Sequence, residues 1–217
     1  MAALDTLDRL DEVEGLDDAQ EQAAERAETV GSFVANFRDR TRVLVERGTV
    51  ERSEVEERER VIEAAAEGSE HLKLADLDAT VLGQAMVGGG DGGVRLSRDV
   101  FATVGTAADV EQAQHVAAHE REHARQARLH GTLVIDGKEV DHLLLLEGGA
   151  EIAGNEAVGK GLDHHRAGQP KEVYEEGQRA VVDIIHRVGR AKLDAVLKGS
   201  GDVTLLRDTK EEQVLAA

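Results

Sequence analysis

His119-Glu120-Arg121-Glu122-His123 stands inside a run of residues whose pattern predicts a helix. Residues four apart in a helix lie one turn apart, so the two imidazoles of this stretch project from one face. Two neutral imidazoles at this spacing can hold one zinc ion, and Glu120 beside them can take a proton from water bound to the metal. Chance alone produces this pattern in roughly a few per cent of chains so rich in Glu and His, so the surrounding residues decide its meaning.

The composition favours a helical protein with a small sheet. Of the 217 residues, 41% are apolar but only 2% are aromatic, so Leu, Val, Ile and Ala must build most of the core. The single Pro favours long helices over a loop-rich or all-β fold. We therefore expect an α+β fold, mostly helical, in which a small antiparallel sheet packs on the helix that carries the two histidines.

The charge and the cysteine count exclude several classes of function. A formal net charge of −18 argues against nucleic acid and against anionic membrane surfaces as partners. Without Cys there is no disulfide and no thiolate metal ligand. The N-terminus lacks the basic and apolar regions of a secretory signal, and no window approaches the roughly 20 apolar residues that span a bilayer. These features predict a cytoplasmic protein, with export by another route left open.

Residues 1–70 are predicted to form an acidic helical N-terminal segment without a catalytic constellation. An amphipathic stripe begins it, a second helix ends near Gly48, and a third helix, capped by Thr49 or Ser53, runs through Ala66. The stripe consists of Leu4, Leu7, Leu10 and Val13. We expect these helices to pack on the rest of the chain or to make a homo-oligomer contact. A pro-segment or inhibitory arm is the alternative.

A second predicted domain covers residues 71–200 and opens with strands. The glycine-rich stretch 88–93 predicts a flexible turn, and Val94–Ser97 predicts the strand that returns from it in a β-hairpin. The glycines do not form a phosphate loop, because the G-K-[S/T] ending and the helix that should follow are missing. Residues 201–217 predict a frayed C-terminal tail.

Local signals place the remaining helices. Thr106 and Asp109 predict a capping box that opens the helix of the two histidines, which should run to about His130 with Gly131 as its stop. The elements expected after it are a small hairpin at 132–140, a helix that begins at Asp141 or His142, a helix at Lys171–Val188 after Pro170, and a last helix at Arg190–Leu197.

A catalytic zinc site needs a third protein ligand beside the two histidines. Glu147 is the best candidate, because it ends a run of four leucines that would be buried, where a carboxylate is costly unless it is paired or binds a metal. Glu151 lies one turn later on the same face and can accept a hydrogen bond from a ligating imidazole. Gly148 and Gly149 lower helix propensity, and we expect them to allow two helices to approach closely near the metal.

Together these motifs resemble those of the gluzincin metallopeptidases, the zincins that use two His and one Glu as zinc ligands. The matching pieces, within about residues 78–200, are His119-Glu120-x-x-His123, Glu147-Gly148-Gly149-Ala150-Glu151 and Tyr174-Glu175-Glu176-Gly177. The second piece is similar to the third-ligand helix of M1-type and compact peptidase-MA-like enzymes. The third is similar to the M1-type segment whose Tyr stabilises the tetrahedral intermediate.

The resemblance implies a zinc-dependent enzyme that hydrolyses peptide bonds through a metal-activated water. The implied zinc ligands are His119, His123 and Glu147. Glu120 is then the general base, Tyr174 donates a hydrogen bond to the developing oxyanion, and Glu151 supports a ligating imidazole. Val94–Ser97 is the implied sheet edge along which an extended peptide or protein substrate binds by β-addition.

Two other functions remain open at this point. One is a catalytically inactive zincin-fold protein with a structural or assembly role. The other is a toxin-like secreted protease that uses residues 1–70 for delivery or inhibition.

Several side chains also have two interpretations. His115 either supports a zinc ligand or is a surface or partly buried residue. His164 or His165 is either an alternative oxyanion donor or part of a polar loop. Tyr174 either acts in catalysis or packs its ring with its hydroxyl in water. We expect His142 and His186 to be structural.

Overall fold

The computed structural model of the chain describes residues 15–78, 80–127, 132–135, 138–159, 171–201 and 206. The chain divides into two compact units, one of residues 1–85 and 94–120, the other of residues 86–93 and 121–217. The predicted boundary at residue 70 falls inside the first unit. Several predictions lie outside the described residues: those for the Leu4–Val13 stripe, His130, Gly131, His164, His165, Pro170 and most of the C-terminal tail.

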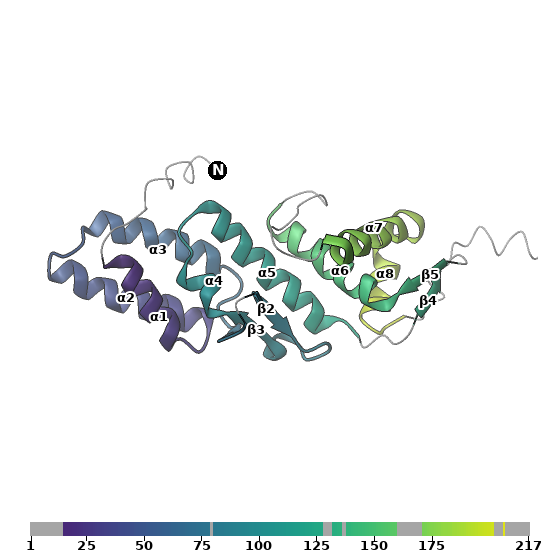
Figure 1. The fold of residues 1–217 in the computed structure, drawn as a ribbon, viewed down its shortest axis with the longest axis horizontal. Coiled ribbons are helices and arrows are strands. Elements are labelled where there is room, and N and C mark those ends of the chain that lie inside the picture. The colour runs from purple at the N-terminus through teal and green to yellow at the C-terminus, as the bar shows by residue number, and fades with distance from the viewer. Residues whose placement is uncertain are drawn as a thin grey trace, which may run out of the picture. The chain divides into compact units, whose positions relative to one another are not determined.

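The first unit is a group of helices around the three phenylalanines of the chain. Its helices are α1 (Leu16–Arg26), α2 (Val30–Glu46), α3 (Arg52–Ala66), α4 (Arg98–Ala102) and the N-terminal part of α5 (Ala107–Arg125). Helix α1 packs on α2 and α4, and α2 packs on α3 (Figure 1). Phe33, Phe37 and Phe101 are fully buried, and the ring centroids of Phe33 and Phe101 lie 5.8 Å apart. A chain poor in aromatic residues thus concentrates its phenylalanines in one core.

Capping interactions fix where these helices begin. The N–H of Asp109 donates to the Thr106 hydroxyl at 3.3 Å, and the Asp109 carboxylate accepts from the N–H of Thr106 at 2.9 Å. The predicted capping box of α5 is therefore confirmed. The predicted cap of α3 is wrong: the N-cap residue is Glu51, which lies between Thr49 and Ser53. The reason is that the Glu54 carboxylate, three residues further on, accepts from the N–H of Glu51 at 3.0 Å and so fixes the start of the helix there.

The first unit also contains a three-stranded sheet. Its strands are β1 (Lys73–Ala75), β2 (Gly83–Ala85) and β3 (Val94–Ser97), in the spatial order β1-β3-β2. Strands β2 and β3 pair antiparallel, which confirms the predicted hairpin, but β1 pairs parallel with β3. The sheet is thus mixed, and the prediction of a wholly antiparallel sheet is wrong. Alternation of side chains along a strand reports burial and does not report the direction of its neighbour.

Strand β3 lies in the middle of this sheet. Val94 and Leu96 are almost fully buried, whereas no residue of β2 is. A strand that buries its side chains in this way takes the central position, so both edges of β3 already pair with neighbouring strands. The prediction that Val94–Ser97 offers a free edge to an extended peptide is therefore wrong.

Gln20 joins α1 to the end of α4. Its Nε2 donates to the carbonyls of Phe101 and Val104, both at 2.8 Å, and its Oε1 accepts from Arg58 Nη1 at 2.9 Å. The Gln20 side chain is fully buried. One amide therefore satisfies two carbonyls that a helix end leaves without partners, together with one buried guanidinium.

Substitution Gln20→Met is expected to destabilise the protein by about 3 kcal/mol. Met keeps the length of the side chain but leaves buried carbonyls and a buried guanidinium without one of their partners, and each such loss costs about 1–3 kcal/mol. The free energy of unfolding in urea measures the effect. A variant as stable as the wild type would show that water or a rearranged side chain replaces the amide.

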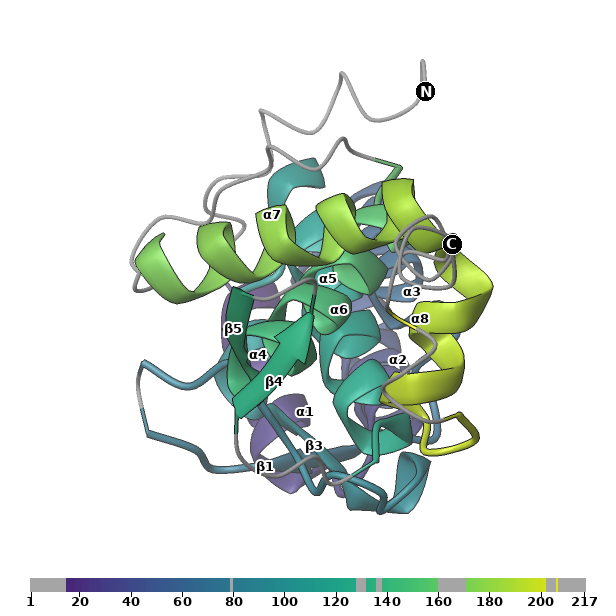
Figure 2. The ribbon, with the colours of Figure 1, turned by 90° about the vertical axis from the view of Figure 1, so that its right-hand side faces the viewer.

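The second unit is built around α6 (His142–Ala157), α7 (Lys171–Val188) and α8 (Arg190–Leu197), together with the C-terminal end of α5. The predicted hairpin is present as antiparallel strands β4 (Thr132–Ile135) and β5 (Lys138–Asp141), and a short 3-10 turn, η2, covers Asp91–Gly93. Helix α7 lies against α6 in both views (Figures 1 and 2). The buried core between these helices contains Leu145, Leu146, Ile152, Val181, Ile184, Leu193, Val196, Leu197 and Leu206.

Local hydrogen bonds fix where α6 begins and where α5 ends. The Asp141 carboxylate accepts from the N–H of Leu143 at 2.9 Å, so Asp141 is the N-cap of α6, one of the two predicted starts. Helix α5 ends at Arg125, earlier than predicted. The N–H of Ala127 donates to the carbonyl of Leu197 at 2.6 Å and not to the carbonyl one turn before it, because packing against the end of α8 diverts the backbone.

Among the described residues, no helix combines the length and the apolar character that crossing a membrane requires.

Candidate metal centre

Two imidazoles from helix α5 and one carboxylate from helix α6 lie close to one another. His119 and His123 are one turn apart on α5, and Glu147 lies on α6. Each residue offers one ligand atom, and these atoms all lie within 4.8 Å of one another. In the described part of the chain this is the one group of three or more such residues with the geometry to hold a metal ion. His119, His123 and Glu147, the three predicted ligands, are thus brought together.

The contact between His123 and Glu147 lies wholly within the second unit. His123 Nε2 and Glu147 Oε2 are 3.3 Å apart, and the two side chains are 12% and 27% exposed. A lone pair on the nitrogen and a carboxylate oxygen repel each other at this distance. The contact is therefore favourable only with a proton on Nε2 or with a cation between the two atoms.

The number and the chemical type of the three side chains are those of a zinc site. His119 is only 8% exposed, whereas Glu147 is partly open to solvent. Three protein ligands are the number that a catalytic zinc site uses, together with one position for water or substrate. Imidazole and carboxylate are also the donors that suit zinc when no thiolate is available, and the chain has no Cys.

Glu120 occupies space that a glycine provides. A Cβ atom at Gly83, on β2, would lie 2.5 Å from Glu120 Cγ and 3.0 Å from Glu120 Oε1. Any other residue at position 83 would push the Glu120 side chain aside, because real contacts of a Cβ are longer. The sequence showed only a glycine beside a strand pattern, and its contact with the candidate general base appears only in the fold.

Gln126 is a further residue at the site that the sequence did not single out. Its side chain is fully buried. Gln126 Oε1 lies 2.8 Å from His123 Nδ1, and Gln126 Nε2 donates to the carbonyl of Leu146 at 2.7 Å. The one available signal was its position three residues after His123, on the same side of the helix. Such a spacing is too common to have predicted the contact.

The other predicted residues have different outcomes. Glu151 is 4% exposed and lies one turn after Glu147, and its support of an imidazole stays a prediction. Tyr174 is in α7, but its side chain lies outside the described residues, so its role also stays a prediction. His115 is 1% exposed and stacks on His119 with ring centroids 6.1 Å apart, so it is not a surface residue.

The glycines of the Glu147 segment confirm the expected close approach of helices. A Cβ atom at Gly148 would lie 2.2 Å from the carbonyl oxygen of Gly177 on α7. A Cβ atom at Gly149 would lie 2.9 Å from Leu197 Cδ1 and 3.3 Å from Gln126 Nε2. Both glycines therefore make room for neighbours of the helix that carries Glu147.

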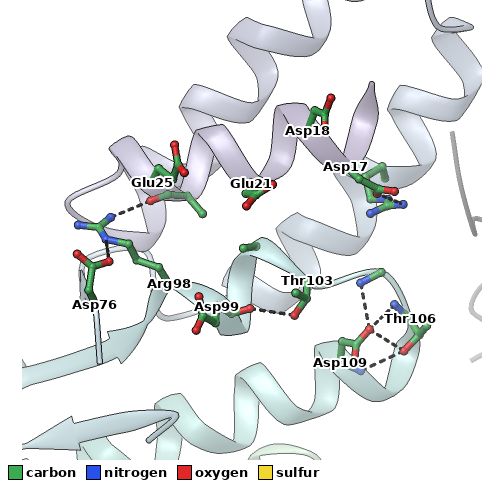
Figure 3. A pocket seen from close by; sticks show the side chains of 14 residues that line it. Asp17, Asp18, Glu21, Glu25, Asp76, Arg98, Asp99, Thr103, Thr106 and Asp109 are labelled. Carbon is green, nitrogen blue, oxygen red and sulfur yellow. Dashed lines mark hydrogen bonds and ion pairs between the residues drawn. The ribbon is translucent and has the colours of Figure 1, made fainter. Parts of the chain in front are cut away.

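A separate cavity of about 900 Å³ opens in the first unit between α1, α4 and the start of α5 (Figure 3). Carboxylates dominate its lining, among them Asp17, Glu21 and Asp99. Its two arginines have structural partners: Arg58 pairs with Asp17 at 3.1 Å, and Arg98 donates to the Ala24 carbonyl at 2.8 Å. These contacts hold neighbouring helices together. None of the residues that line the cavity is His119, His123 or Glu147.

Comparison with known proteins finds no matching family, no matching curated protein and no matching solved structure.

Proposed function

We propose that this chain is a zinc-dependent metallopeptidase of the gluzincin type. The observation that carries the proposal is the convergence of two imidazoles and a carboxylate from α5 and α6, with ligand atoms within 4.8 Å of one another. These are the residues that the motif spacing selects, and they come from two different helices. A chance H-E-x-x-H would not be expected to meet a carboxylate from the E-G-x-A-E segment of another helix.

In this proposal His119, His123 and Glu147 hold the metal ion. Bound zinc supplies Lewis-acid chemistry, because it polarises a carbonyl oxygen and acidifies water. The Glu120 carboxylate accepts a proton from the water that attacks the peptide carbonyl carbon. It then delivers that proton to the leaving amine nitrogen as the carbon–nitrogen bond breaks. The Tyr174 hydroxyl donates a hydrogen bond to the carbonyl oxygen as it gains negative charge.

The proposed substrate is a peptide or protein segment in an extended conformation. The proposed peptide-binding edge is that of strand β2, whereas the sequence had suggested the edge of β3. Among the described residues β2 pairs with β3 alone, and its Gly83 lies against the Glu120 side chain. A peptide that adds to the outer edge of β2 would therefore run past the proposed general base.

Metal binding tests the proposed site directly. Purified wild-type protein is expected to contain about one zinc ion per chain, as the three ligands of a single catalytic site require. His123→Ala and Glu147→Ala should each lose the ion, because two remaining ligands bind zinc far more weakly. Mass spectrometry of metals, on protein prepared without a chelator or a His tag, measures the content.

Two matched variants test whether the loss of a His or a Glu elsewhere in the second unit also lowers the zinc content. His186→Ala removes an exposed histidine of α7, and Glu156→Ala removes an exposed carboxylate of α6 that pairs with Arg190. Both should keep the zinc content of the wild type. Wild-type protein that takes up no zinc after reconstitution would refute the proposed function.

A further inference from the structure

We propose that Gln126 is a positioning residue, which keeps the proton of His123 on Nδ1 and so leaves Nε2 to bind the metal. That Nε2 binds a metal ion rests on the proposed function. The structural basis for the role of Gln126 is independent of that function and lies entirely within the second unit. The contacts of one buried amide carry it.

The carbonyl of Leu146 decides which way the Gln126 amide faces. A backbone carbonyl only accepts hydrogen bonds, so the atom 2.7 Å from it must be the amide nitrogen. The amide oxygen then faces His123 Nδ1 at 2.8 Å. The flipped amide would set oxygen against oxygen at the Leu146 carbonyl, at the cost of a hydrogen bond to a fully buried group.

The amide oxygen in turn decides which nitrogen of His123 carries the proton. An amide oxygen accepts a hydrogen bond, so His123 Nδ1 must donate, and the neutral ring then has a lone pair on Nε2. His123 Nε2, which then carries the lone pair, lies 3.3 Å from Glu147 Oε2. The two facing acceptors are the arrangement that a metal ion between them would satisfy.

The same amide also links the two helices that carry ligands. Leu146, which accepts from Gln126, directly precedes Glu147 on α6. A Cβ atom at Gly149 would lie 3.3 Å from Gln126 Nε2, so the missing side chain there leaves room for the amide. Gln126 thus sets the protonation of one ligand and the distance to the helix of the other.

Zinc affinity, measured by competition with a chelator, is the first test. Gln126→Met keeps the length of the side chain but removes the acceptor, and its dissociation constant for zinc should rise about 10- to 100-fold, as expected for loss of a partner behind a metal ligand. Gln126→Glu keeps an acceptor toward His123 but loses the donor to Leu146. It should lower the thermal stability of the metal-free protein while keeping zinc affinity within about threefold of the wild type. A Gln126→Met variant that binds zinc as tightly as the wild type would overturn the proposal.

Gln20→Met is the matched control, since it makes the same change at a fully buried glutamine that also donates to backbone carbonyls. It should lower stability and leave zinc affinity unchanged. If Gln126 has only a structural role, stability and zinc affinity should instead fall together in both Gln126 variants.

Nitrogen NMR of the His123 ring gives a second measurement that needs no metal. At alkaline pH, where imidazoles are neutral, Nδ1 should carry the proton both with and without zinc, because Gln126 is fully buried while Glu147 is partly exposed and can turn toward solvent. In Gln126→Met the proton should move to Nε2. His123→Ala identifies the signal.

The two measurements separate the possible failures. If the wild type binds no zinc, the proposed function fails, and the proton position in the metal-free protein still decides the role of Gln126. If Nδ1 lacks a proton in the wild type, the role of Gln126 is refuted even when zinc binds.

Discussion

Glu120→Gln is expected to lower peptide hydrolysis by about 10²- to 10⁴-fold, the usual contribution of a general acid–base group. Gln has nearly the same shape as Glu, so it should fit beside Gly83 without disturbing β2. It cannot take a proton from water or return one to the leaving amine. Zinc content should stay at the wild-type value, because Glu120 is not among the three proposed ligands.

The assay uses zinc-loaded protein and an unfolded, fluorescently labelled protein substrate, with products identified by mass spectrometry. Glu122→Gln is the matched control: Glu122 is on the same helix, is 7% exposed and lies 3.7 Å from Lys198 Nζ. It should keep most of the activity. Hydrolysis that persists in Glu120→Gln would remove Glu120 from the mechanism. A zinc-loaded wild type that cleaves none of a broad peptide library would favour the inactive zincin-fold alternative.

Gly148→Ala is expected to destabilise the second unit by about 3 kcal/mol or more, the upper range for overpacking in a close-packed interior. The added Cβ would lie 2.2 Å from the carbonyl oxygen of Gly177 and 2.3 Å from its carbon. Both are backbone atoms of α7, so no side chain can rotate away. The two helices would have to separate, and the packing of the core between them would be lost. Gly177→Ala should have a similar effect, since its Cβ would lie 2.5 Å from the carbonyl oxygen of Leu144.

Urea denaturation followed by far-ultraviolet circular dichroism measures this effect. Gly92→Ala is the matched control, because a Cβ at Gly92 meets nothing within 4 Å. It should change stability by less than about 0.5 kcal/mol, as surface substitutions usually do. If Gly148→Ala unfolds at the same urea concentration as Gly92→Ala, the close contact of α6 and α7 does not exist in solution.

Local features of the fold could be predicted wherever one short stretch contains the whole cause. The capping box of Thr106 and Asp109 and the Asp141 cap of α6 are of this kind, because donor and acceptor lie within a few residues of each other. The β2–β3 hairpin follows from a glycine-rich turn between two strand patterns. These features needed no knowledge of the rest of the molecule.

Features that depend on distant residues were missed or mistaken. The central position of β3 depends on β1 arriving beside it, and no pattern within 94–97 reports that. Helix α5 ends early because Leu197, far along the chain, takes the N–H of Ala127. The role of Gly83 beside Glu120 has the same origin.

The candidate metal centre shows the same division. The sequence alone determined that His119 and His123 share one face, since the helical repeat of 3.6 residues fixes side chains four apart. It also selected Glu147, because a carboxylate at the end of an apolar run needs a partner. Only the tertiary structure decided that Glu147 reaches His123 and that the Gln126 amide stands behind that imidazole. The physical reason is that these contacts depend on how α6 packs against the end of α5, and residues far apart in the chain, including Gly149 and Leu197, set that packing together.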